Sequence, residues 1–181
     1  MKKLLIIGAF LTAFINSSYG QEGTIRVNPA VMLGVPIGDF SEVYGMGVGI
    51  GVKGLYSLNT GGELTFSTGY TRFGLKDSYA AGLKGSLGII PLLAGYRHHL
   101  ERIYLEPQLG LSINSSTIKG SFLGMDSFGG SASSTSLGYA ATVGYFLGDI
   151  DLSLRYQGLA LSGDGLGFIG IRVGYQFKLK N

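Results

Sequence analysis

The stretch Ile103–Ile113 reads IYLEPQLGLSI and changes character with a period of two. Its odd positions hold Ile, Leu, Pro, Leu, Leu and Ile, whereas its even positions hold Tyr, Glu, Gln, Gly and Ser. Successive side chains of a β-strand point to opposite faces, so the pattern predicts a strand with one wholly apolar face. The other face is polar or small except for Tyr104. The fold must therefore offer this strand an apolar environment on one side and a polar one on the other.

Seven further segments follow the same rule. In 169–179, the residues Ile, Ile, Val, Tyr, Phe and Leu alternate with Gly, Arg, Gly, Gln and Lys. The fourth segment is ambiguous, because Ile89–Leu93 reads IIPLL and is apolar on both faces. The pattern predicts eight strands, at about 24–35, 45–57, 62–73, 87–98, 103–113, 135–147, 150–161 and 169–179.

The connections between these segments differ in length in a regular way. Those near 59–61, 99–102 and 148–149 are short. Those at about 36–44, 74–86 and 114–134 are long and rich in Gly, Ser and charged residues, which predicts loops, and 162–166 is of intermediate length. Short turns on one side, longer loops on the other and an even strand count are typical of outer-membrane barrels. The predicted fold is all-β, an eight-stranded antiparallel up-and-down transmembrane β-barrel.

Composition supports this class and excludes others. The 181 residues include 32 Gly and no Cys, only 14% are charged, and the mean hydropathy is +0.31. Collagen would need a strict Gly period, and a disordered chain would lack the 45% apolar content. A soluble lipocalin-like barrel or sandwich remains the alternative, but its exterior would need more charge than a face of Gly, Ser and Thr supplies. Aromatic residues near the strand ends predict interfacial girdles: Tyr56, Tyr70, Tyr96, Tyr139, Tyr145, Tyr175 and Phe177.

The first twenty residues have the pattern of a cleaved signal peptide. Lys2 and Lys3 precede an apolar run over 4–15, and small residues at Ser18 and Gly20 predict cleavage before Gln21. The run is shorter than the ~20 residues of a spanning helix, which argues against an uncleaved anchor. Removing 1–20 takes away two lysines and no acids, so the formal charge falls from +3 to +1. We therefore expect a barrel domain of residues 21–181 with no case for nucleic-acid binding.

Several stretches resemble the outer-membrane β-barrel domain family, the small OmpA/OmpX-like barrels. They are Gly34–Ser41 (GVPIGDFS), Gly45–Gly49 (GMGVG), Gly69–Phe73 (GYTRF), Ile90–Leu93 with Tyr96 and Arg97, and Gly170–Phe177 (GIRVGYQF). The resemblance implies an eight-stranded barrel in a Gram-negative outer membrane, with lipid and lipopolysaccharide as neighbours and the barrel-assembly machinery as partner during biogenesis. It implies no catalytic residues. It also implies that Tyr175 and Phe177 carry the C-terminal assembly signal. Phe177 would then act from four residues before Asn181.

The sequence motifs that could indicate catalysis or cofactor binding lack the neighbouring structure that such sites need. Gly49–Gly54 matches G-x-G-x-x-G, but no helical segment follows to hold a pyrophosphate. His98 and His99 are the only histidines and, as strand neighbours, point to opposite faces. No nucleophile and base can be paired from this sequence. We expect no enzyme, no cofactor and no metal site.

Charged residues on the inward face predict a hydrogen-bonded plug, since buried charges persist only when they are paired. The expected network comprises Arg26, Lys53, Glu63, Arg97, Glu106, Asp151, Arg155, Arg172 and Lys178. Arg155 and Arg172 should lie near each other and require an acid from across the lumen. The favoured function is a structural or surface-interaction barrel with a filled lumen. The alternatives are a narrow porin-like diffusion channel and an adhesion or ligand-binding barrel acting through its long loops, with an extracellular partner that the sequence does not identify.

Overall fold

The computed structural model describes residues 23–58, 61–76, 83–122, 125–160 and 165–180. The predicted signal peptide, 1–20, lies outside these residues. The described strands are β1 (Ile25–Ile37), β2 (Tyr44–Ser57), β3 (Gly62–Leu75), β4 (Leu83–Leu100), β5 (Ile103–Phe122), β6 (Met125–Leu147), β7 (Ile150–Ala160), β8 (Leu166–Tyr175) and β9 (Phe177–Lys180), with one short helix, α2 (Asp39–Val43), between β1 and β2.

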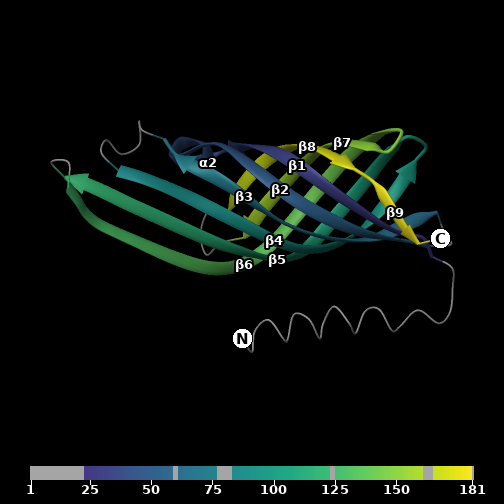
Figure 1. The fold of residues 1–181 in the computed structure, drawn as a ribbon, viewed down its shortest axis with the longest axis horizontal. Coiled ribbons are helices and arrows are strands. Elements are labelled where there is room, and N and C mark those ends of the chain that lie inside the picture. Colours follow the sequence, from purple (N-terminus) through teal and green to yellow (C-terminus); the bar gives the residue numbers. More distant parts are fainter. Residues whose placement is uncertain (1–22, 59–60, 77–82, 123–124, 161–164, 181) are drawn as a thin grey trace, which may run out of the picture.

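The strands close into a barrel through β1, which pairs on both of its edges. Val31 is opposite Ile50 of β2 on one side and opposite Val173 of β8 on the other. β8 and β9 together form the last strand, interrupted at Gln176, whose backbone N–H donates to the carbonyl of Asp149 at 2.8 Å. Neighbouring strands are antiparallel throughout (Figure 1). The prediction of an eight-stranded antiparallel barrel is confirmed.

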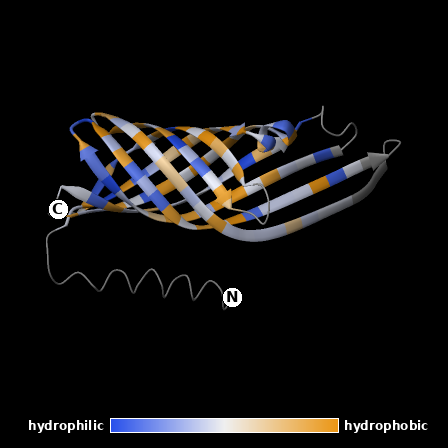
Figure 2. Cartoon of the chain, turned by 180° about the vertical axis from the view of Figure 1, so that it is seen from behind, coloured by the Kyte–Doolittle hydropathy of each residue, from blue (hydrophilic) through white to orange (hydrophobic). Residues whose placement is uncertain are grey.

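Side chains alternate between the outer face and the lumen as the period of two predicts. Val48, Ile50 and Leu109 are more than half exposed on the outside, whereas Lys53 and Glu106 are buried inside. Figure 2 shows this alternation as neighbouring apolar and polar bands along the barrel strands. β1, β2, β3 and β7 contain 11 to 14 residues, and about 9–11 tilted residues cross a bilayer. Each of these strands is therefore long enough to span a membrane.

The barrel has two unlike ends. At the turn end, the tight connections use residues with positive φ: Gly61 (82°), Glu101 (59°) and Gly148 (64°). Glycine carries no Cβ and adopts this conformation without strain. Both ends of the described chain also lie at the turn end (Figure 1). The opposite end, the loop end, carries α2 and the last residues of β3, β5 and β7.

The predicted loop at 114–134 is wrong for its described residues, which continue β5 and β6 as a hairpin. β6 pairs with β7 only from Leu137 onward, so its residues 125–136 pair on one side with β5 and have no described partner on the other. Twelve strand residues extend about 40 Å. We call this hairpin, together with the first residues of β4, the projecting sheet; it extends well beyond the other strands (Figure 1). Its residues 114–117 (NSST) and 131–134 (SASS) are polar or small at successive positions, so they carry no alternation from which a strand could be predicted.

The helix α2 folds over the loop end of the lumen. It buries Phe40 against the rings of Phe73, at 5.0 Å between centroids, and Tyr44, at 5.2 Å. Among the described residues, no helix has the length and apolar character needed to cross a membrane. The role of α2 is therefore local, because it supplies one apolar side chain to the barrel interior at the loop end.

Candidate functional site: the filled lumen

Arg97 of β4 is the centre of a buried ion-pair network near the turn end. Its Nε lies 2.7 Å from Oε2 of Glu106, its Nη2 3.6 Å from Oδ2 of Asp151, and its Nη1 3.8 Å from Oε2 of Glu63. These carboxylates come from β5, β7 and β3, so one guanidinium links three other strands. The arginine side chain is fully buried. A planar fork of donors suits this arrangement, because it can face several acceptors at once.

Two further cations complete the pairing of the acids. Lys53 Nζ lies 2.6 Å from Oε1 of Glu106, and both side chains are fully buried. Arg26 Nη2 lies 2.6 Å from Oε1 of Glu63, at the more open edge of the network. The other oxygen of Glu63 lies 2.9 Å from Nε2 of His99, the half-buried histidine. His98 points outward, as the alternation predicted.

Tyr104 forms the floor under Arg97. The guanidinium carbon lies 3.7 Å from the ring centroid, and the tyrosine hydroxyl donates to Oδ1 of Asp151 at 2.7 Å. The opposite position on β6 is Gly144, and a Cβ there would overlap the tyrosine ring. Asn28 donates to the second oxygen of Asp151 at 3.1 Å. Tyr104, the one large aromatic residue on the otherwise polar or small face of Ile103–Ile113, is therefore part of the ion-pair network.

A second polar layer lies next to this network, toward the middle of the barrel. Arg155 donates from Nη1 to Oε1 of Gln108 at 2.7 Å and from Nε to Oε1 of Gln157 at 3.2 Å. Ser67 donates to the same oxygen of Gln108 at 3.0 Å. Arg172 is buried, and its Nη1 has no hydrogen-bond partner. Within the described ranges, neither Arg155 nor Arg172 lies within 4 Å of a carboxylate oxygen, so the predicted acid across the lumen is replaced by amides.

An apolar layer closes the lumen toward the loop end, which the sequence analysis did not predict. Phe73 contacts Phe168 with ring centroids 5.1 Å apart, and Phe40 covers them from α2. The buried members of this cluster are Phe40, Phe73, Leu87, Ile89, Leu159 and Phe168. Ile89 points into the lumen, whereas the next residue, Ile90, points outward. This explains why the fourth segment is apolar on both faces. The strand there separates two apolar environments, the lumen cluster and the outside.

Most of the predicted lumen residues lie where the alternation placed them. Arg26, Lys53, Glu63, Arg97, Glu106 and Asp151 form one connected network, and Arg155 and Arg172 form the layer beside it. Lys178 does not join them, since it is exposed at the turn end on the short strand β9. The amides Asn28, Gln108 and Gln157 were missed as members. Their inward positions on alternating strands were the available indication.

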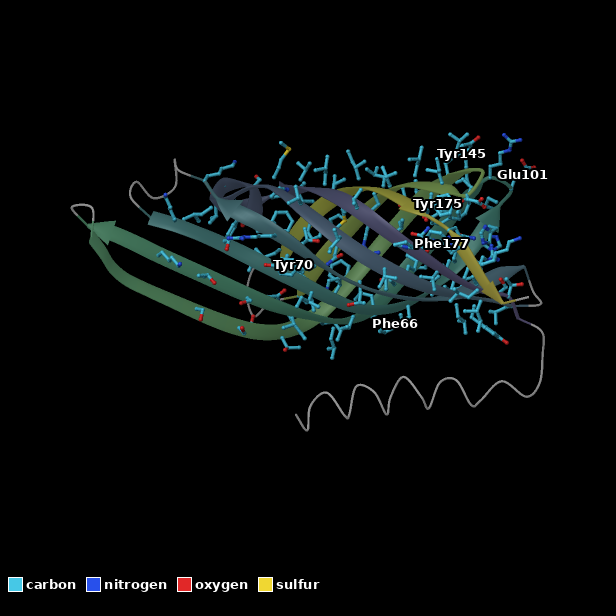
Figure 3. All side chains as sticks on the ribbon, in the orientation of Figure 1. Phe66, Tyr70, Glu101, Tyr145, Tyr175 and Phe177 are labelled. Atoms are coloured by element: carbon cyan, nitrogen blue, oxygen red, sulfur yellow. The ribbon has the colours of Figure 1, made fainter. Side chains whose placement is uncertain are left out.

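Aromatic residues lie on the outer face at the positions predicted for girdles. Tyr145, Tyr175 and Phe177 gather at the turn end with Glu101, and Tyr70 lies farther toward the loop end (Figure 3). The rings of Tyr175 and Phe177 are 4.7 Å apart. Both side chains are exposed, so they are available to surroundings outside the barrel.

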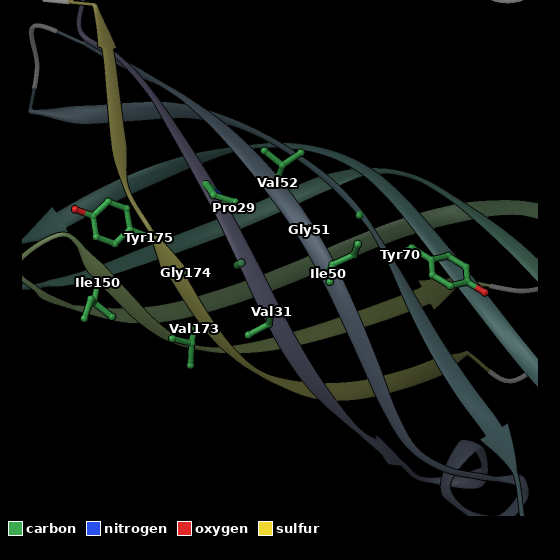
Figure 4. Close-up of a pocket in the computed structure, with 12 residues that line it drawn as sticks. Pro29, Val31, Ile50, Gly51, Val52, Tyr70, Ile150, Val173, Gly174 and Tyr175 are labelled. Atoms are coloured by element: carbon green, nitrogen blue, oxygen red, sulfur yellow. The ribbon is translucent and has the colours of Figure 1, made fainter.

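An apolar groove crosses the outer face over β1, β2 and β3 and reaches β8 and the start of β7 (Figure 4). Its volume is about 780 Å³. Val31, Ile50, Val173 and Tyr175 line it, and Gly51 also borders it. The groove faces away from the lumen, so it belongs to the surface that meets the surroundings and is separate from the ion-pair network.

Comparison with known proteins places the fold. No protein-family model matches the chain, and no curated protein matches its sequence. Among solved structures, Ail, the attachment invasion locus protein of Yersinia pestis, aligns with a TM-score of 0.63 and 20% identity, covering 87% of this chain and 100% of that one. The same protein in complex with the heparin analogue sucrose octasulfate aligns with a TM-score of 0.62 and 21% identity over the same shares of the two chains. A major outer membrane protein of Thermus thermophilus aligns with a TM-score of 0.50 and 15% identity, over 88% of this chain and 100% of that one. The chain has the fold of the small eight-stranded outer-membrane barrels.

Proposed function

We propose that the chain is an integral outer-membrane barrel with a sealed lumen, which holds the projecting sheet at the cell surface and performs no catalysis. The observation that carries this proposal is the double filling of the lumen. Ion pairs occupy it near the turn end, and an aromatic and aliphatic cluster occupies it toward the loop end. An open channel needs a continuous water-filled path, and the buried side chains of both layers occupy that path.

Orientation follows from the unlike ends of the barrel. Barrels of this class keep short turns on the periplasmic side and long connections outside. The projecting sheet then faces the exterior, and the outward apolar residues face lipid. The groove over β1 to β3 fits acyl chains of membrane lipid, including lipopolysaccharide, because its named lining is apolar. Export through a signal peptide at 1–20 and assembly through Tyr175 and Phe177 belong to the same proposal.

Planar-bilayer recording of the refolded protein tests the sealed lumen. We expect no steady single-channel steps at moderate voltage. The matched control is a variant in which Arg97, Glu106 and Asp151 are all replaced by Ser, provided that it still shows heat-modifiable gel migration. If the unaltered protein conducts in regular steps, the sealed lumen is refuted and the narrow diffusion channel takes its place.

A second candidate function, adhesion to an anionic partner, is favoured by one feature of the projecting sheet. Lys84 of β4 lies directly opposite Lys119 of β5, and both are exposed. Like charges in opposite positions of a sheet repel each other and are destabilising. A polyanion bound across the pair would relieve this repulsion. The surface role would then rest on charge as well as on the free edge of β6.

Retention on a heparin column tests adhesion. The folded protein should elute at higher salt than its Lys84→Gln/Lys119→Gln variant. Lys178→Gln at the turn end is the control with one cation removed, and its elution should stay unchanged. If the double variant elutes with the unaltered protein, the lysine pair has no such role.

A further inference from the structure

The described lumen carries more positive than negative charge. Its inward-facing cations are Arg26, Lys53, Arg97, Arg155 and Arg172, and its acids are Glu63, Glu106 and Asp151. The three acids are engaged by the first three of these cations. The excess therefore resides on two arginines. A buried charge is costly unless a counter-charge or several hydrogen bonds compensate it.

These two arginines are neighbours on one face of the β7–β8 pair. Arg155 is opposite Gly170, and Arg172 is opposite Ser153, so the arginines occupy adjacent positions along the diagonal of the ladder. Residues in this relation lie roughly 7–8 Å apart, and their Cβ atoms somewhat closer, so that long side chains can reach a shared ligand. Glycine at 170 leaves room beside these arginines for the Met32 side chain, which a Cβ at 170 would overlap.

A small cavity is lined by both guanidinium-bearing side chains. Its volume is about 30 Å³, and its polar lining includes Arg155, Arg172, Gln157, Ser67 and Thr71. Arg172 is only 6% exposed, and its buried Nη1 lacks a hydrogen-bond partner among the described residues. A water molecule needs about 10–15 Å³ of such space, so the cavity has room for one small monatomic ion.

We propose that a halide ion, chloride in the cell, binds between Arg155 and Arg172 and compensates one of the two excess positive charges. Guanidinium N–H groups and a hydroxyl are the donors that such an anion requires. The acids of the lumen cannot take this role, because Arg97, Tyr104 and Asn28 already engage Asp151, and Arg97 and Lys53 engage Glu106. The site depends on the lumen geometry and holds whether or not the barrel conducts.

Anomalous diffraction from crystals of the intact protein soaked in bromide tests the site directly. We expect a bromide peak in the cavity between the two arginines, at a position that no crystal neighbour contacts. Density that shows only water there overturns the proposal. This outcome is independent of the sealed-lumen test, since a non-conducting barrel can lack the ion and a conducting one can hold it.

A measurement in solution separates the site from general attraction to cations. The ³⁵Cl resonance of chloride should broaden with the refolded protein in a non-ionic detergent, and the broadening should be lost in Arg172→Met. Lys178→Met removes one exposed cation and should keep the broadening. If Arg172→Met does not show heat-modifiable migration, Arg155→Gln takes its place. Equal broadening by the lumen variant and by Lys178→Met would refute a bound halide.

Discussion

Replacing Arg97 by Met should destabilise the barrel more than any other single exchange in the charged network. The arginine faces carboxylates on β3, β5 and β7 at 3.8, 2.7 and 3.6 Å, and its side chain is fully buried. Removing one partner of a buried pair typically costs about 3–5 kcal/mol, because the remaining charges lose their compensation. Lys53 and Arg26 still face two of the acids. We therefore expect the free energy of unfolding to fall by roughly 3–5 kcal/mol.

Equilibrium urea unfolding of the protein refolded into lipid vesicles measures this loss. With a slope of ~1–3 kcal/mol per molar urea, the midpoint should fall by at least ~1 M. Arg97→Lys should lose less than Arg97→Met, because it keeps the charge but not the fork that reaches three acids. Lys178→Met should stay within about 0.5 kcal/mol, as exposed positions do.

A double-variant cycle examines whether the loss comes from the ion pairs. Combined with Arg97→Met, the change Glu106→Gln should cost less than it does alone, because its main partner is already gone. If Arg97→Met loses less than ~1 kcal/mol, the lumen is hydrated rather than dry, and the reasoning about buried charge fails. Additive losses would contradict the direct pairing of Arg97 with Glu106.

Three further outcomes are expected. Gly144→Ala should cost ~1–3 kcal/mol in urea unfolding, because the new methyl group overlaps the ring of Tyr104, whereas Gly130→Ala, with open space around it, should be close to neutral. Phe40→Ala should cost up to ~3–5 kcal/mol by emptying the apolar layer but produce no single-channel steps in bilayers, since the charged layer remains. Phe177→Ala should lower the amount of folded protein in the outer-membrane fraction, while its refolding in detergent stays normal. If the variant and the unaltered protein reach the outer-membrane fraction in equal amounts, Phe177 is not part of the assembly signal.

The charged network was predictable from the sequence because the alternation separates two unlike faces. Glu106 and Asp151 each stand between two apolar neighbours, and Glu63 and Arg97 each stand beside one apolar or aromatic neighbour, so their inward direction follows from the alternation. The alternation does not predict which cation forms an ion pair with which acid. Gln157 lies two positions along the same strand as Arg155, whereas Gln108 of β5 reaches Arg155 of β7 only because the barrel brings these non-neighbouring strands around one lumen.

Two other features were not predictable, for opposite reasons. Phe73 and Ile89 point into the lumen but are apolar, like the residues that point outward. The lumen toward the loop end is itself apolar, so the sequence there shows no contrast between the two faces of the strand. In the projecting sheet both faces meet water, so Ser133 and Ser134 point to opposite sides without any change of character. Such a segment has the composition of a loop and the backbone of a strand.

The pairing of β1 with β8 and β9 also determines how the chain can fold. The first strand of the barrel finds its second neighbour only in the last strands of the chain, as in the pair Val27 and Phe177. Contacts this distant in sequence make folding slow. Until they form, β1 and the growing end of the sheet present open hydrogen-bonding edges that invite aggregation. A chain cut short before Gly170 would therefore yield no smaller barrel, only a sheet with two unprotected edges.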